Sequence, residues 1–164
     1  MATNLKNLSD FSHLEVGSAA NLEIAIVVAQ WNAQVTSPLL EGAYNRLLKQ
    51  GALEDKIHVL QVPGSYELSA GADIILRKKQ IDAVICLGCV IQGDTPHFTF
   101  ICEAVANGVT NVSLKYNKPV IFGVLTTNTL AQALERAGGK HGNKGEEAAV
   151  TAIQMANLSK SISA

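Results

Sequence analysis

The densest group of chemically useful residues lies between positions 86 and 98, where an apolar run is followed by a glycine turn and then by a helical pattern. We expect Thr95 to cap this helix and Pro96 to take its first position, because a threonine hydroxyl accepts an orphan backbone N–H and proline lacks one. The other N–H groups and the positive end of the helix dipole favour an anion, typically phosphate. His97 follows in the first turn, where it either transfers protons or only hydrogen-bonds locally. The segment predicts acid–base chemistry on a phosphorylated substrate.

Three further side chains could contact such a substrate. Trp31, the single tryptophan, either stacks on a planar heterocycle or fills space beneath a loop. Glu67 lies near a helix start, where the dipole keeps its carboxylate ionised, so that it either accepts hydrogen bonds from hydroxyls or caps the helix. Arg136 precedes a glycine-rich, basic segment at 138–145, and this region either holds phosphate or forms an adaptable connection. No Gly-Lys-Ser/Thr follows the glycine turn at 93–95, so an ATP site is not predicted.

Alternating strand and helix patterns must position these residues. Short apolar, β-branched runs predict strands at 23–29, 57–62, 83–91 and 120–125, and helical spacing of apolar residues predicts helices that include 40–48, 68–76, 98–112, 130–134 and 149–156. The alternation predicts an α/β fold, a three-layer α/β/α sandwich with a four-stranded parallel sheet. Ligands of such sheets bind outside the carboxyl ends of the strands. Residues 1–20 are expected to form an N-terminal arm or an edge strand, followed by a single domain at 21–164.

Composition excludes several other classes of protein. The net charge is −1, with Lys and Arg spread along 164 residues, which argues against nucleic acid as a partner. The apolar runs are shorter than the ~20 residues of a membrane-spanning helix, and the N-terminus lacks an apolar signal core, so we expect a cytoplasmic protein without membrane contact. Only 16% of the residues are charged and 48% are hydrophobic. We therefore expect part of the surface to meet another subunit, the alternative being a compact monomer.

The cysteines allow two interpretations. Cys86 and Cys89 form a Cys-x-x-Cys pair within an apolar strand run, and the chain has three cysteines in total. Side chains three residues apart on a strand point to opposite faces, which favours packing over a redox or metal function. No second Cys/His pair with metal spacing is present, and an odd number of cysteines implies no disulfide framework.

Several segments, in order along residues 23–158, resemble the lumazine synthase family. They are Gln-Trp-Asn at 30–32, Val-Pro-Gly-Ser-Tyr-Glu at 62–67, Gly-Cys-Val-Ile-Gln-Gly-Asp-Thr-Pro-His-Phe at 88–98, Val-Ile-Phe-Gly-Val-Leu-Thr at 120–126, Glu-Arg-Ala-Gly at 135–138 and Gly-Asn-Lys-Gly at 142–145. The resemblance implies a flavodoxin-like sandwich. It also implies condensation of 5-amino-6-(D-ribitylamino)uracil with 3,4-dihydroxy-2-butanone 4-phosphate. The products would be 6,7-dimethyl-8-ribityllumazine, phosphate and water, in the penultimate step of riboflavin biosynthesis, with no metal or organic cofactor.

The resemblance further implies a role for each matching residue. For the pyrimidine substrate, it implies stacking by Trp31, backbone contacts from Cys89, Val90 and Ile91, and binding of the ribityl chain by Ser65, Tyr66 and Glu67. For the phosphorylated substrate, it implies phosphate binding by Asp94 and Thr95 and proton transfer by His97. Phe122 and Arg136 would come from a neighbouring subunit, Arg136 to the phosphate, and Lys144 would lie near that phosphate. Three positions depart from common forms of the family. Asp94 stands where a small residue is frequent, Gln92 replaces a basic residue, and Trp31 replaces Phe.

An oligomer is also implied, because the family forms homopentamers with active sites between subunits. Some members assemble twelve pentamers into a hollow 60-subunit shell. The short segment 138–145 has no insertion, which favours the shell over the free pentamer. Riboflavin synthase is a candidate partner enclosed by such a shell.

Three alternative functions remain open at this point. A flavodoxin-like module that holds FMN without catalysis would share the sheet and a phosphate turn, but does not require both His97 and Arg136. The second alternative is a structural shell protein with a degenerate site. The presence of Trp31 and Glu67 in addition to His97 and Arg136 argues against it. A thiol redox function ranks last.

Overall fold

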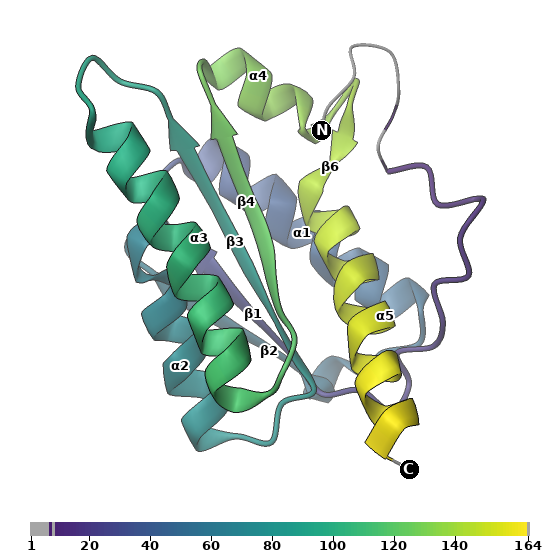
Figure 1. Cartoon of the computed structure of the whole chain (residues 1–164). Coiled ribbons are helices and arrows are strands. Elements are labelled where there is room, and N and C mark those ends of the chain that lie inside the picture. Colours follow the sequence, from purple (N-terminus) through teal and green to yellow (C-terminus); the bar gives the residue numbers. More distant parts are fainter. Residues whose placement is uncertain (1–6, 8, 164) are drawn as a thin grey trace.

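Four parallel strands form the centre of the protein, in the order β2-β1-β3-β4 (Figure 1). The computed structural model describes residues 7 and 9–163. The strands are β1 (Ile24–Ala29), β2 (Ile57–Val62), β3 (Ala83–Ile91) and β4 (Val120–Thr127). β1 is buried along its whole length and β3 along all but its last two residues. This burial explains why both strands are continuous apolar runs instead of alternating patterns.

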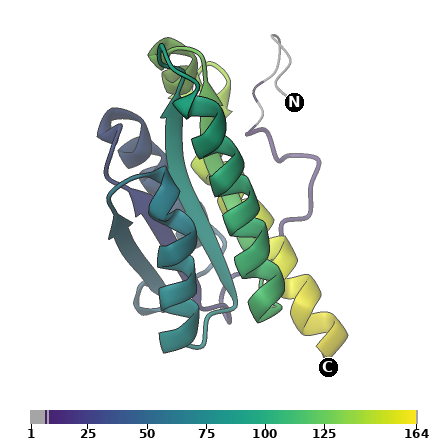
Figure 2. The ribbon, with the colours of Figure 1, turned by 60° about the vertical axis from the view of Figure 1, so that its left-hand side comes forward.

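Helices cover both faces of the sheet. They are α1 (Ala33–Lys49), α2 (Leu68–Lys78), α3 (His97–Tyr116), α4 (Leu130–Glu135) and α5 (Lys144–Ser163), with 3-10 turns η1 (Glu54–Lys56) and η2 (Ser65–Glu67). One core cluster joins the sheet to α1 and α5, and a second joins it to α2 and α3. Figures 1 and 2 show α2 and α3 on one side of the sheet and α5 on the other. The predicted three-layer, flavodoxin-like α/β/α sandwich is confirmed.

The two cysteines of the Cys-x-x-Cys pair lie on opposite faces of β3. Cys89 packs in the cluster with α1 and α5, and Cys86 packs in the cluster with α2 and α3. Burial raises the pKa of Cys86 to about 12 and that of Cys89 to about 11. Both thiols are therefore neutral near pH 7, whereas redox chemistry needs the thiolate. Their geometry supports packing and opposes a dithiol function.

The boundaries of three elements differ from the sequence-based predictions. β4 continues two residues beyond 125, and α3 begins at His97 with Pro96 as its N-cap, so that Thr95 is not the cap. The glycine-rich segment at 138–145, for which no strand was predicted, forms a small antiparallel hairpin of β5 (Ala137–Gly139) and β6 (Gly142–Asn143). Gly138 and Gly142 adopt φ of 106° and 86°, which only glycine adopts readily. These left-handed conformations turn the chain into the hairpin.

The described part of the N-terminal segment forms an arm and contains no strand. In Figure 1 it is the purple coil that runs beside α5. Three α5 side chains spaced three residues apart donate to carbonyls with the same spacing, two in the arm and one in the residue that follows it. These bonds are Gln154 Nε2 to Glu15 O (3.3 Å), Asn157 Nδ2 to Ser18 O (3.1 Å) and Lys160 Nζ to Asn21 O (2.8 Å). The arm and the helix therefore run in the same direction along one face of the protein.

Replacing Gly145 by alanine is expected to destabilise the protein by about 3 kcal/mol. A Cβ at this position in α5 would overlap the carbonyl oxygen of Leu39 and lie 2.7 Å from its carbonyl carbon. Backbone atoms of α1 cannot turn away as a flexible side chain does. The free energy of unfolding, measured in urea, tests this expectation. Gly93→Ala is the control, because a Cβ there meets no atom within 4 Å. Equal stability of the two variants would contradict the close approach of α1 and α5.

Candidate active site

Hydrogen bonds join the chain segments that follow β1 and β2 to each other and to the end of β3. The Trp31 backbone N–H donates to the Pro63 carbonyl at 3.0 Å. The Asn32 side-chain amide donates to the Cys89 carbonyl at 3.0 Å, and the Ser65 hydroxyl donates to the same oxygen at 3.3 Å. Asn32 has a φ of 60°, a left-handed conformation that asparagine tolerates, and it immediately precedes α1. These bonds fix the three segments to one another at the carboxyl edge of the sheet.

Trp31, Gly64 and Glu67 form one continuous surface at this edge. The Trp31 side chain is 67% exposed, which excludes the interpretation that it fills space beneath a loop. A Cβ on Gly64 would lie 2.5 Å from Cε3 of Trp31 and 3.2 Å from Oε2 of Glu67, so glycine allows the indole to approach the backbone. The Gly64 N–H donates to Oε2 of Glu67 at 3.0 Å. Glu67 thus serves as a cap through one oxygen, while Oε1 makes no hydrogen bond to the described residues.

The loop between β3 and α3 is open to solvent. Gly93, Asp94, Thr95 and His97 are all exposed. Within residues 7 and 9–163, the backbone N–H groups at 93–95 donate no hydrogen bond, and the His97 imidazole has no hydrogen-bond partner. Unpaired N–H groups beside a helix start are suited to an anion. The histidine is therefore free to reach a ligand held there.

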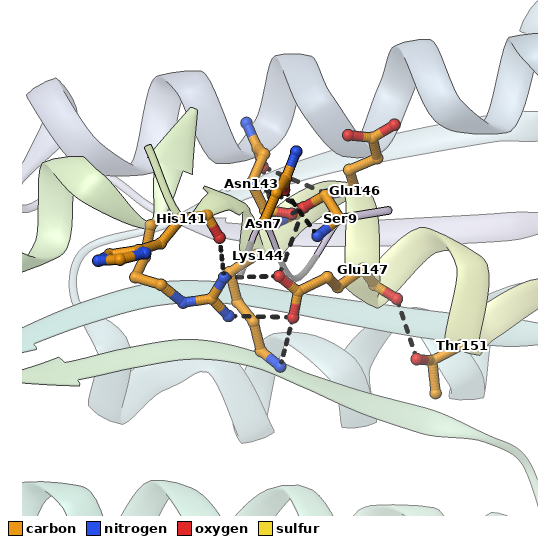
Figure 3. Close-up of polar contacts among 10 residues, drawn as sticks. Asn7, Ser9, His141, Asn143, Lys144, Glu146, Glu147 and Thr151 are labelled. Carbon is orange, nitrogen blue, oxygen red and sulfur yellow. Dashed lines mark hydrogen bonds and ion pairs between the residues drawn. The ribbon is translucent and has the colours of Figure 1, made fainter. Parts of the chain in front are cut away.

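Arg136 and Lys144 lie elsewhere, beside a cavity of about 520 Å³ at the end of β4. The cavity is lined by Val124, Leu125, Thr126, Thr127, Gln132, Glu135, Arg136, Lys140, His141 and Lys144. Arg136 forms a two-point ion pair with Glu147, with Nη1–Oε1 and Nη2–Oε2 distances of 2.7 and 3.0 Å. Arg136 Nη1 also donates to the His141 carbonyl at 2.7 Å, and Lys144 Nζ lies 3.4 Å from Oε2 of Glu147. Figure 3 shows Glu147 and Lys144 in this group.

The ion pair with Glu147 holds the Arg136 guanidinium in place but leaves some of its N–H donors unused. Arg136 has five N–H donors, and its hydrogen bonds to the described residues account for three of them. Its side chain is 13% exposed and that of Glu147 is 16% exposed, so the pair is largely shielded from water. A guanidinium held in this way retains donors for an anion in the cavity.

Most of the residues predicted for the site therefore fall into two groups within one chain. None of Trp31, Glu67 and His97 lines the cavity beside Arg136. Phe122 lies in neither group, because it pairs with Cys86 partway along the edge strand β4 and packs on the side of α2 and α3. Tyr66 is 57% exposed, and Val90 and Ile91 are half-buried at the end of β3.

Two residues at these groups were not predicted from the sequence. Glu147 is eleven residues from Arg136, and no local pattern indicated that they pair. Gly64 matters because its missing side chain admits the Trp31 ring, a contact between segments that no local pattern indicates. Among the described residues, no group of three His, Cys, Asp or Glu side chains could hold a metal ion. No helix in the described part of the chain is both long and apolar enough to cross a membrane.

Comparison with known proteins decides the family. The model of the 6,7-dimethyl-8-ribityllumazine synthase family matches residues 21–160. The chain belongs to this family. One similar relative is the lumazine synthase of Cytophaga hutchinsonii, which is 57% identical over 94% of this chain and 97% of the relative. Another, from Parabacteroides distasonis, is 52% identical over 97% of this chain and 99% of the relative. A third, from Porphyromonas gingivalis, is 51% identical over 98% of this chain and 99% of the relative. As a member of this family, the chain is an enzyme of the transferase type in riboflavin biosynthesis.

Proposed function

We propose that this chain performs the lumazine synthase reaction at the carboxyl edge of its sheet, with 5-amino-6-(D-ribitylamino)uracil on the Trp31 surface. The observation that supports this assignment most directly is the combination of an exposed indole, a carboxylate beside it and a loop of unpaired N–H groups at the same edge. The indole suits a pyrimidine ring, and the free oxygen of Glu67 suits ribityl hydroxyls. The loop suits the phosphate of 3,4-dihydroxy-2-butanone 4-phosphate.

The chemistry requires alignment and proton transfer. The arylamine attacks the ketone and forms an imine with loss of water, elimination then releases phosphate, and ring closure releases water to give 6,7-dimethyl-8-ribityllumazine. No electrons enter or leave, so the balance needs no redox partner. In this proposal His97 moves protons between these intermediates, and holding the two substrates together supplies several kcal/mol of the barrier reduction.

Arg136, Lys144 and Phe122 complete the site in this proposal from a neighbouring subunit. The separation of the Arg136 cavity from His97 within one chain supports this arrangement. Large exposed apolar side chains, among them Phe100, Leu114 and Ile162, support contact with further copies. We propose a homopentamer, with twelve pentamers in a 60-subunit shell as the first choice and riboflavin synthase as a candidate partner. Light scattering tests the assembly, and a monomeric mass for active protein would overturn it.

We also propose a cytoplasmic location. Cys86, Cys89 and Cys102 are all unpaired, as is usual where thiols are kept reduced. Fractionation of the source cells with an antibody against the chain tests this, and recovery outside the cytoplasm would contradict it.

Adding a methyl group at Gly64 is expected to raise the KM for the pyrimidine substrate about tenfold, because stacking on an aromatic contributes ~1–3 kcal/mol. The new Cβ must displace the exposed Trp31 ring, so binding is expected to weaken while the free energy of unfolding changes little. Steady-state kinetics of Gly64→Ala measure the effect. In a Trp31→Ala background, Gly64→Ala is expected to cause little further increase in the KM for the pyrimidine substrate. An equal KM increase for both substrates would contradict this interpretation.

The function itself is tested by an absorbance assay for lumazine formation from the two substrates. Formation of the product by the purified chain supports the proposal. Protein that carries tightly bound yellow FMN and forms no lumazine would overturn it in favour of a flavin-binding module.

A further inference from the structure

The hydroxyl of Ser9, in the N-terminal arm, lies at the start of α5 beside Glu147. It accepts a hydrogen bond from the Asn143 backbone N–H at 2.7 Å. Its own proton is directed to either the Asn143 carbonyl at 3.2 Å or Oε1 of Glu147 at 3.4 Å. Figure 3 shows the side chain of Ser9 between these two residues. Oε1 is also the oxygen that accepts from Nη1 of Arg136 at 2.7 Å. The arm therefore reaches the carboxylate that holds the guanidinium.

Asn143, the other residue that Ser9 contacts, organises the first turn of α5. Its side-chain oxygen accepts from the backbone N–H groups of Gly145 at 2.8 Å and Glu146 at 3.3 Å, as an N-cap does. Its side-chain amide donates to the Pro38 carbonyl of α1 at 2.9 Å. Glu147 projects from this same turn. Ser9 thus contacts both Glu147 and the residue that fixes the helix start from which Glu147 projects.

A second contact holds the arm in place two residues further on. The ring of Phe11 lies over the guanidinium of Arg46, with its centroid 4.9 Å from Cζ, and Arg46 forms an ion pair with Glu146. A Cβ on Gly142 would lie 2.5 Å from Oδ1 of Asn7 and 2.9 Å from Cβ of Ser9, so the hairpin is shaped for the close approach of the arm. With the hydrogen bonds to Glu15, Ser18 and Asn21, the arm is held from the start of α5 to its end.

We propose that Ser9 is a positioning residue for phosphate binding, acting through Glu147 on the guanidinium of Arg136. The proposal rests on the function proposed above for Arg136. Without the hydroxyl, the Asn143 N–H loses its acceptor and Glu147 loses a donor near Oε1. The carboxylate then samples more orientations, and Arg136 is less precisely held for the anion. In this way the arm contributes to binding of the phosphorylated substrate, although it does not contact the ligand itself.

The test compares Ser9→Ala with Ser12→Ala in the full-length protein. Ser12 is an exposed serine of the same arm, and its backbone and side-chain hydrogen bonds to Asp10 stay within the arm. We expect Ser9→Ala to raise the KM for 3,4-dihydroxy-2-butanone 4-phosphate about three- to tenfold, the range for one lost hydrogen bond. The inhibition constant of inorganic phosphate is expected to rise by the same factor. The KM for the pyrimidine and kcat are expected to stay within about twofold of wild type, as are all values for Ser12→Ala.

A double-variant cycle with Glu147→Gln separates this role from a general structural one. If Ser9 acts through Glu147, Ser9→Ala adds little in the Glu147→Gln background. Additive effects, an equal rise in both KM values, or unchanged phosphate readouts in Ser9→Ala would each overturn the proposal. The variant Arg136→Ala distinguishes a failure of the role proposed for Arg136 from a failure of the role proposed for Ser9. Unchanged phosphate readouts in Arg136→Ala would overturn the proposed role of Arg136, and with it that of Ser9. A large effect in Arg136→Ala with none in Ser9→Ala would overturn the role of Ser9 alone.

Discussion

Replacing Arg136 by alanine is expected to lower kcat/KM for 3,4-dihydroxy-2-butanone 4-phosphate about 100- to 1,000-fold. The guanidinium is held by Glu147 at 2.7 and 3.0 Å and retains N–H donors for the anion. Its loss removes these donors and leaves Glu147 near the cavity with Lys144, at 3.4 Å, as its remaining cationic partner among the described residues. Without Arg136, the charges of Lys140 and Lys144 are balanced by those of Glu135 and Glu147, so the net positive charge that attracts a phosphate dianion is lost. Steady-state kinetics with the phosphorylated substrate varied measure this loss.

The design of the Arg136 experiment includes two further variants. Arg136→Lys keeps the charge but cannot form the two-point pair with Glu147, so we expect it to recover only part of the activity. Arg77→Ala removes an arginine of α2 that pairs with Asp73 and is 60% exposed, and it is expected to behave as wild type. Full activity of Arg136→Ala, or an equal loss in Arg77→Ala, would show that phosphate binding does not depend on this guanidinium.

Replacing His97 by alanine is expected to lower kcat about 100-fold without abolishing turnover. The imidazole is exposed in the first turn of α3 and has no partner within the described part of the chain, so its loss leaves the neighbouring backbone intact. Substrate alignment by the rest of the site remains and supports the residual rate. Both KM values are expected to stay within about threefold, because proton transfer acts on the transition state more than on binding.

The absorbance assay for lumazine formation, run with each substrate varied in turn, checks the role of His97 by separating kcat from the two KM values. His13→Ala, in the exposed part of the arm, is the matched control and is expected to retain the wild-type rate. Near-wild-type rates in His97→Ala would reject proton transfer by this residue.

Much of the fold could be predicted because its signals are local. β1 and β3 are buried and therefore uninterrupted in apolar character, and their predicted positions agree with the structure to within a residue. Boundaries were less accurate where glycine or proline permits more than one geometry, as at Pro96 and at the 137–143 hairpin. The hairpin at 137–143 contacts α1 and α5. A short glycine-rich segment has no periodic pattern of apolar residues from which these contacts could be predicted.

By itself, the sequence determined that Trp31, Glu67 and His97 share one edge of the sheet. The reason is topological, since each follows a strand of a parallel sheet, and parallel strands end at the same edge. Only the tertiary structure decided which groups these and the other candidate residues contact. The pairing of Arg136 with Glu147, the approach of the Trp31 ring to Gly64, and the contact of Ser9 with Asn143 across 134 residues all depend on how separate elements pack. Such contacts arise from the meeting of surfaces in space, and neither composition nor periodicity along the chain encodes them.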